Sequence, residues 1–167
     1  MRERLFYFTS AWAADRLKLP APAPRRQVQW WDEDEEAANN RPIEVDIDPN
    51  LGRTPREQLD GFIETFVIGW PRAKLIRKQG FGSEPPFRRM WPPRSSVVEM
   101  RTVQTRTFGF FSCKGVYVGM RVDLTENTHA NNDRLYNEYG DYVMQRLRHI
   151  VSSDVDVVSD VEDLIGG

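Results

Sequence analysis

The stretch from Val97 to Leu124 constrains the fold most, because it is the one long run in which strand-forming residues alternate and turn signals fall between them. Its runs cover 97–102, 105–111 and 116–124. Short connections between such runs predict neighbouring strands that pair antiparallel. Gly109 and Gly119 lie inside the predicted strands, which indicates bulges or a close approach of two backbones.

A helix is expected before this stretch. Thr54 can cap it, Pro55 suits its first position, and Glu57 completes a capping box. Apolar residues follow at helical spacing until Trp70, and Pro71 ends the helix there. This pattern predicts one apolar face along the whole helix.

A second helix is expected after the stretch, from Asn132 or Asp133 to about Ile150. A polar loop over 125–132, which contains His129, is expected to precede it. The predicted buried stripe of this helix comprises Leu135, Tyr139, Tyr142, Val143, Leu147 and Ile150.

The chain is long enough for one domain with a substantial core, since its 167 residues are 40% apolar and 29% charged. We expect an α+β fold, with a small antiparallel sheet of about three to five strands and two main helices packed on it. We assign 1–42 to an N-terminal segment with a Pro-rich and acidic arm, 43–151 to a single core domain and 152–167 to an acidic tail. Short strands at 5–9 and 43–48 and a short helix at 72–79 are also expected.

Other features bear on location and cofactors. No apolar run reaches the roughly 18 residues of a transmembrane helix, so we expect no membrane partner. Cys113 is the single cysteine and cannot form an internal disulfide, which favours the cytoplasm, with a virion as the alternative for a structural component. No metal-ligand spacing and no phosphate- or dinucleotide-binding motif occurs, so we expect neither a metal nor a cofactor.

Charge is strongly segregated along the chain, although the formal net charge is only −2. Residues 72–121 contain eleven basic and two acidic side chains, a balance of +9. Residues 32–60 and 122–167 each contain ten acids and three bases. A central basic block can hold an anionic partner, or it can pair with the acidic flanks of its own chain.

The candidate functional residues lie on and around the central stretch. Glu99 and Arg101 are two apart in a strand and so share a face, and strand pairing could bring Arg106 and Arg121 beside them. Such cations could stabilise charge that develops during phosphodiester cleavage, with His129 as a general acid or base. The alternative is that Glu99 pairs with an arginine and only satisfies the sheet surface. The candidates for nucleic-acid or anion binding are Arg77, Lys78, Arg88, Arg89, Arg94 and Lys114.

Three short motifs carry a resemblance to a known family: Val98-Glu99-Met100-Arg101, Arg106-Thr107-Phe108-Gly109-Phe110-Phe111 and Val116-Tyr117-Val118. Their order resembles that of small phage-associated proteins distantly similar to the RelE/HigB-like toxin superfamily. The resemblance implies a small antiparallel sheet with helices packed on it, RNA cleavage that is often directed at mRNA on the ribosome, and neutralisation by an antitoxin. Arg101, Arg106 and Arg121 would then be the catalytic candidates, and Arg121 stands where such toxins commonly carry a larger basic cluster.

The sequence leaves the function open between several hypotheses. The first is an accessory protein of a phage or mobile element that binds RNA or an acidic protein surface through the basic block. The second is an active, metal-independent endoribonuclease of the RelE/HigB-like kind. The third is a non-catalytic interaction, virion or anti-defence protein that uses its acidic flanks. The expected partners are accordingly RNA, the ribosome, or a protein such as an antitoxin, a host protein or a phage protein, with the oligomeric state open.

Overall fold

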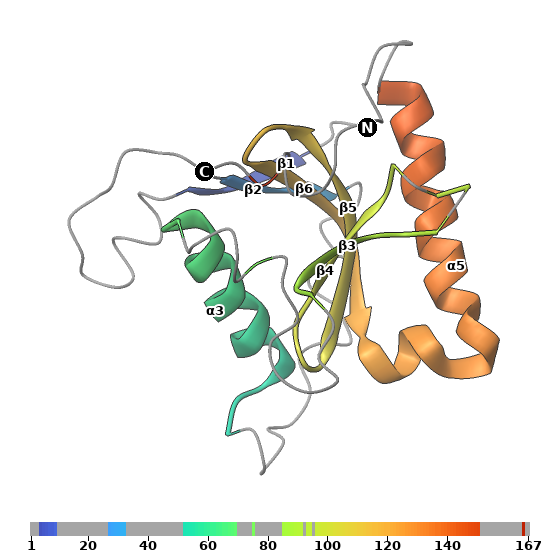
Figure 1. Ribbon diagram of the computed structural model, residues 1–167, viewed down its shortest axis with the longest axis horizontal. Coiled ribbons are helices and arrows are strands. Elements are labelled where there is room, and N and C mark those ends of the chain that lie inside the picture. The colour runs from blue at the N-terminus through green and yellow to red at the C-terminus, as the bar shows by residue number, and fades with distance from the viewer. Residues whose placement is uncertain are drawn as a thin grey trace.

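Six strands form one sheet in the order β1-β2-β6-β5-β4-β3 (Figure 1). This computed structural model describes residues 52–69, 75, 85–91, 93–94, 96–148 and 165, and the backbone alone at 4–9, 27–32 and 149–150. The strands are β1 (Arg4–Thr9), β2 (Gln27–Asp32), β3 (Phe87–Arg89), β4 (Val98–Arg101), β5 (Thr105–Cys113) and β6 (Val116–Leu124). The two main helices are α3 (Pro55–Val67) and α5 (Thr125–Ile150).

The predicted α+β class is confirmed, because β3 to β6 form an antiparallel sheet with two helices packed on it. β1 and β2 extend this sheet beyond the expected size, since β2 pairs parallel with β6 and β1 pairs antiparallel with β2. Both strands come from the segment 1–42. The predicted strand at 43–48 and helix at 72–79 lie outside the described residues, apart from the helical Leu75, and so does the tail apart from Ile165.

The first predicted helix is confirmed as α3. The Thr54 side chain accepts a hydrogen bond from the Glu57 backbone, the Glu57 carboxylate accepts one from the Thr54 backbone, and Pro55 stands at the first helical position. These contacts satisfy backbone N–H groups that a helix start leaves without partners. The helix then places Leu59, Ile63 and Phe66 against the sheet.

The two helices lie on opposite sides of the sheet (Figure 1). On the α3 side, Phe66, Phe87 and Tyr117 belong to an apolar core that also contains Ile165, so this residue of the predicted tail packs on the fold. On the α5 side, Phe108 and Val143 belong to a second buried cluster. Side chains alternate across a strand, so β5 and β6 contribute to both clusters. The charged side chains of these strands gather on the α5 side.

α5 differs from the prediction at its start. Residues 125–129, which we expected in a loop, form a helical turn, and the break comes at 130–133. Asn131, Asn132 and Asp133 all have positive φ, of 50°, 57° and 59°. Asn and Asp tolerate this left-handed conformation better than most residues. The break turns the chain sharply before the long part of α5 begins (Figure 1).

A bulge in β6 confirms the expectation for the strand glycines. Phe108 pairs with Arg121 while Gly109 pairs with Gly119, so Met120 is an extra residue in β6. A Cβ atom on Gly109 would lie 2.0 Å from the Val118 carbonyl oxygen, so only glycine fits at this position. On either side of the bulge, Val118 and Arg121 both face α5.

Candidate functional site

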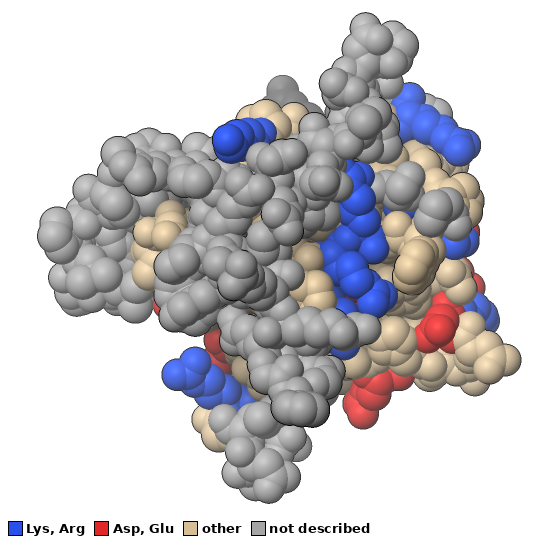
Figure 2. All heavy atoms as spheres, viewed as in Figure 1, with Lys and Arg blue, Asp and Glu red and all other residues tan. Residues whose placement is uncertain are grey.

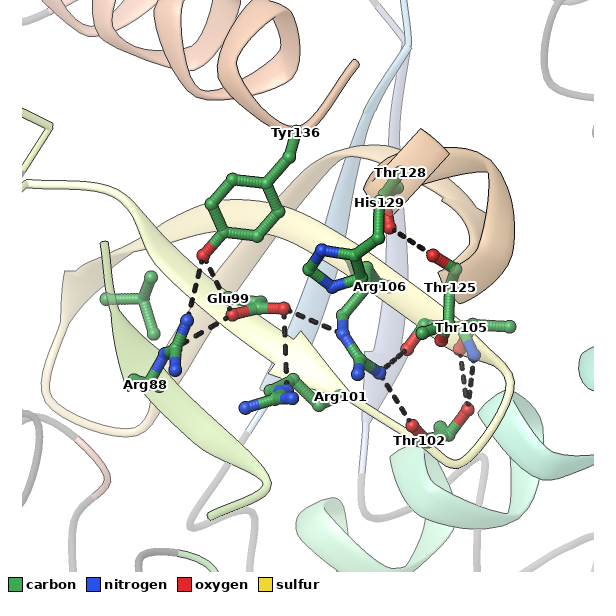
Figure 3. Close-up of polar contacts among 12 residues, drawn as sticks. Arg88, Glu99, Arg101, Thr102, Thr105, Arg106, Thr125, Thr128, His129 and Tyr136 are labelled. Carbon is green, nitrogen blue, oxygen red and sulfur yellow. Dashed lines mark hydrogen bonds and ion pairs between the residues drawn. The ribbon is translucent and has the colours of Figure 1, made fainter. Parts of the chain in front are cut away.

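The candidate site is built around the carboxylate of Glu99, whose side chain is only 1% exposed. Arg106 Nε lies 2.9 Å from Glu99 Oε1, and Arg101 Nε lies 3.5 Å from the same oxygen. Arg88 Nε lies 3.6 Å from Oε2 (Figure 3). We call Arg88, Glu99, Arg101 and Arg106 the arginine cluster. Its four side chains together carry a formal charge of +2.

Strand register explains why these residues meet. Glu99 pairs with Arg88 of β3, and Arg101 pairs with Arg106 of β5. Glu99 and Arg101 are two residues apart in β4, so all four side chains lie on the face that α5 covers. The four residues thus come from three neighbouring strands, and none of them lies in a loop.

Two rings from α5 cover the cluster. The Tyr136 hydroxyl donates to Glu99 Oε2 at 3.2 Å and accepts from Arg88 Nη2 at 3.2 Å. The His129 ring stacks on Tyr136, with ring centroids 5.4 Å apart, and His129 Nδ1 lies 2.7 Å from Asp133 Oδ1. Burial and the neighbouring Glu99 carboxylate raise the pKa of Tyr136, so this hydroxyl stays protonated. The His129 side chain is 43% exposed and forms the accessible part of this cover.

The guanidinium groups are held at different depths. Arg106 Nη1 donates to the carbonyl oxygens of Thr102, at 2.9 Å, and Thr105, at 3.1 Å. The Arg101 and Arg106 side chains are about as buried as each other, whereas Arg88 is 31% exposed. Arg88 is therefore the most exposed arginine of the cluster.

Burial changes the pKa values of charged groups at this site. It lowers the pKa of Arg101 to about 10, and the adjacent Arg106 adds to that effect. Burial also raises the pKa of Glu99, while Arg106 and Arg88 act in the opposite direction. A second negative charge placed near Arg101 would favour its charged form. The arrangement is therefore suited to receiving an anion.

Not all the predicted catalytic candidates meet at this cluster. The structure brings Arg101 and Arg106 into it and places His129 beside it. Arg121 faces the same helix, but Phe108 stands between it and Glu99 in the sheet. The Arg121 guanidinium lies over the Tyr142 ring, 3.7 Å from its centroid. Arg121 therefore has a separate packing role on the α5 face.

The predicted anion-binding residues are also spread out. Arg88 belongs to the cluster, whereas its neighbour Arg89 points to the opposite face of β3 by strand alternation. Arg94 forms a two-pronged ion pair with Asp141, at 2.7 and 2.8 Å, and Lys114 lies exposed at the β5–β6 turn. Arg77 and Lys78 lie outside the described residues.

Tyr136 is the site residue that the sequence analysis missed. The predicted stripe used Leu135, but Tyr136, Gly140, Val143 and Leu147 are the buried positions over residues 134–148 of this helix. Their spacing of four, three and four residues is itself helical, so this phase was available in the sequence. The Tyr136–Gly140 pair is a less typical core pattern than the Leu135–Tyr139 pair of the predicted stripe.

Comparison with protein-family models, curated proteins and solved structures finds no match to this chain. The RelE/HigB-like similarity therefore stays a prediction. In the described part of the chain, no group of three or more His, Cys, Asp or Glu side chains could hold a metal ion. None of the helices described has the length and apolarity that a bilayer crossing requires.

Proposed function

We propose that this protein binds single-stranded RNA by holding its phosphates at the arginine cluster. The observation that carries the proposal is the convergence of three arginines on one buried carboxylate. Lys and Arg side chains also gather in a band over the part of the molecule where β3 and β4 lie (Figure 2). Phosphate contacts of this kind supply most of the affinity of sequence-independent nucleic-acid binding.

In this proposal Glu99 is a positioning residue. Its carboxylate is too buried to contact RNA, but it holds the guanidinium of Arg106 at 2.9 Å. Planar guanidinium groups bind phosphate through paired N–H donors, so their fixed orientation determines how a phosphate is received. An arriving phosphate also offsets the burial that lowers the pKa of Arg101.

RNA is favoured over an acidic protein surface by the rings beside the cluster. His129 stacks on Tyr136 and keeps its side chain partly exposed. Unstacked bases of single-stranded RNA bind to aromatic rings next to basic side chains. An acidic peptide would use the arginines but would gain nothing from such a ring.

The test is RNA binding by fluorescence anisotropy, with a labelled single-stranded oligonucleotide at low salt. We expect Arg106→Gln to weaken binding by 10-fold or more, and the affinity of the wild type to fall steeply with salt. Lys114→Gln is the matched control, because it removes one positive charge from an exposed turn outside the cluster. Thermal unfolding of each variant checks that it is folded.

Equal losses in Arg106→Gln and Lys114→Gln would contradict the proposal, because they would reflect net charge alone. Displacement of RNA by an acidic peptide at lower concentration than by unlabelled RNA would favour the acidic-protein hypothesis. Tighter RNA binding after removal of 152–167 would show that the acidic flank competes for the same arginines.

RNA cleavage is the second candidate function, favoured by the position of His129 beside the arginines (Figure 3). His129 would take the proton of a 2′-hydroxyl as that oxygen attacks phosphorus. The bond to the 5′ oxygen would break and that oxygen would take a proton from water, leaving a 2′,3′-cyclic phosphate and a 5′-hydroxyl, with the arginines stabilising the extra charge. Gel analysis of RNA incubated with EDTA should show this cleavage in the wild type and its loss in His129→Gln. If the wild type leaves the RNA intact, the cleavage hypothesis is wrong and RNA binding is the remaining proposed function.

A further inference from the structure

A pocket of about 340 Å³ opens beside the arginine cluster. It lies between the β4–β5 turn and the first helical turn of α5. Its size is at the lower end of the range of small-molecule sites. The described residues that line it are Val103, Gln104, Leu124, Thr125, Glu126 and His129.

The pocket and the cluster share a wall. His129 lines the pocket, and its ring stacks on Tyr136, which hydrogen-bonds to Glu99. Arg106 donates to the carbonyl oxygens of Thr102 and Thr105, the residues on either side of the pocket-lining Val103 and Gln104. Figure 3 shows His129, Arg106 and Thr125 side by side. One nucleotide could therefore place its phosphate on the cluster and its base in the pocket.

Hydrogen bonds hold the walls of this pocket in place before a ligand binds. The Thr125 backbone N–H donates to the Gln104 carbonyl at 2.8 Å, and Thr102 and Thr105 bond to each other across the β4–β5 turn. The Gln104 Oε1 atom accepts a hydrogen bond from Gln58 Nε2. This bond occupies the Gln104 Oε1 atom, so the NH₂ group is what the Gln104 amide can offer to a ligand. A preformed site loses less conformational freedom on binding.

We infer that the pocket binds a guanine base, an inference that rests on the proposed RNA binding. Guanine presents one acceptor and two adjacent N–H donors on its Watson–Crick edge. The Gln104 amide can donate to that acceptor, and the Glu126 carboxylate can accept from both N–H groups. The other three bases do not present two adjacent donors to a single carboxylate. Val103 and Leu124 provide the apolar walls, and the His129 ring provides a stacking surface.

The experiment is titration of the full-length protein with each of the four nucleoside 5′-monophosphates, by calorimetry or NMR. Guanosine 5′-monophosphate should bind about 10-fold tighter than the others, the discrimination expected of a two-bond contact to a base edge. Glu126→Gln should reduce this preference to about 2-fold or less. Glu138→Gln is the matched control, because Glu138 is an exposed glutamate of the same helix outside the pocket.

Equal affinity for the four nucleotides would overturn the inference, as would an unchanged guanine preference in Glu126→Gln. The two proposals fail separately. If RNA binds in an Arg106-dependent way without base preference, the proposed function stands and the guanine pocket falls. If guanosine 5′-monophosphate binds in a Glu126-dependent way but longer RNA does not, the pocket stands and RNA binding falls.

Discussion

Glu99 is a carboxylate that the fold has removed from water and surrounded with arginines. Removing a charge from water is expensive, and nearby opposite charges repay the cost only when their geometry is good. Arg106 is the nearest arginine, with its Nε 2.9 Å from Glu99 Oε1, but this contact lacks hydrogen-bond geometry, and Arg101 and Arg88 are more distant. Burial and ion pairing therefore act in opposite directions on this one group.

The pH dependence of stability tells which effect prevails. Burial holds the pKa of Glu99 above its ordinary value of 4.5, so the folded protein keeps this proton to higher pH than the unfolded chain does. Ionisation of Glu99 then makes stability fall as pH rises above 4.5. Glu99→Gln lacks this titration, so its free energy of unfolding should improve relative to the wild type between pH 4.5 and 7. Urea unfolding at several pH values measures the difference.

Glu138→Gln is the control for this experiment, because it makes the same chemical change at an exposed position. Comparing the two variants over the same pH range separates the effect of burying the carboxyl group from the effect of replacing it with an amide. If the wild type instead gains stability over Glu99→Gln as pH rises, the arginines control the ionisation of Glu99.

At the scale of elements, the backbones of β5 and β6 leave no room for a side chain at Gly109. A methyl group there would lie 2.0 Å from the Val118 carbonyl oxygen, and backbone cannot move away cheaply. We expect Gly109→Ala to lower the free energy of unfolding by about 3 kcal/mol or more. Gly61→Ala is the matched substitution inside α3, where the nearest atom would be Arg53 Nη1 at 3.7 Å. That change should raise the free energy of unfolding by about 0.5–1 kcal/mol, by helix propensity. A similar loss in both variants in denaturant titration would contradict this reading.

The connection between β3 and β4 is fastened to α5 by the Arg94–Asp141 ion pair. The hydrogen bond from Arg94 lowers the pKa of Asp141, so this contribution to stability is present above pH 3.8 and is lost as pH falls through the lowered pKa. Because Asp141 is largely exposed, Asp141→Asn should lower the free energy of unfolding by only about 0.2–1 kcal/mol at pH 7. The loss should shrink in high salt and should also shrink as pH falls below 3.8. A loss that depends on neither salt nor pH would indicate that Asp141 stabilises the fold through packing contacts and not through its charge.

Local signals made some elements predictable and others not. The capping box at Thr54 and the alternation in β4 to β6 are short-range patterns, and they were sufficient for α3 and the antiparallel strands. The pairing of β2 with β6 joins residues far apart in sequence, and no local pattern specifies it. The break at 130–133 also shifted the expected start of α5.

The candidate site shows the same division. Glu99 and Arg101 were placed on one face because they are two apart in a strand, and the pairing with Arg106 followed from the predicted hairpin. Arg88 reaches the cluster from a separate short strand, so the sequence showed only that it belonged to a basic block. Tyr136 required the correct helical phase of α5.

At the scale of the whole molecule, the N-terminal strands decide whether β6 is an edge strand. β2 pairs with the start of β6, from Val116 to Gly119, and β1 covers β2. Removing 1–42 would leave N–H and C=O groups of β6 unpaired, and such edges promote association between chains. We expect this truncation to lower the melting temperature and to cause concentration-dependent light scattering. A chain that begins at Arg4 is the control. A truncated protein that stays monomeric and equally stable would mean that 1–42 is a dispensable arm.

The extra residue at Met120 determines which side of the sheet each later residue of β6 faces. If the same sequence ran through this position without a bulge, strict alternation would turn residues 121–124 over. Arg121 and Asp123 would then enter the apolar layer under α3, where unpaired charges are strongly unfavourable. The bulge in this strand, and not composition alone, thus keeps the polar side chains on one side of the sheet and the apolar ones on the other. A distant relative that lacks this one residue needs no bulge and should keep the same order of polar and apolar residues at the end of the strand, a pattern by which such relatives can be sought.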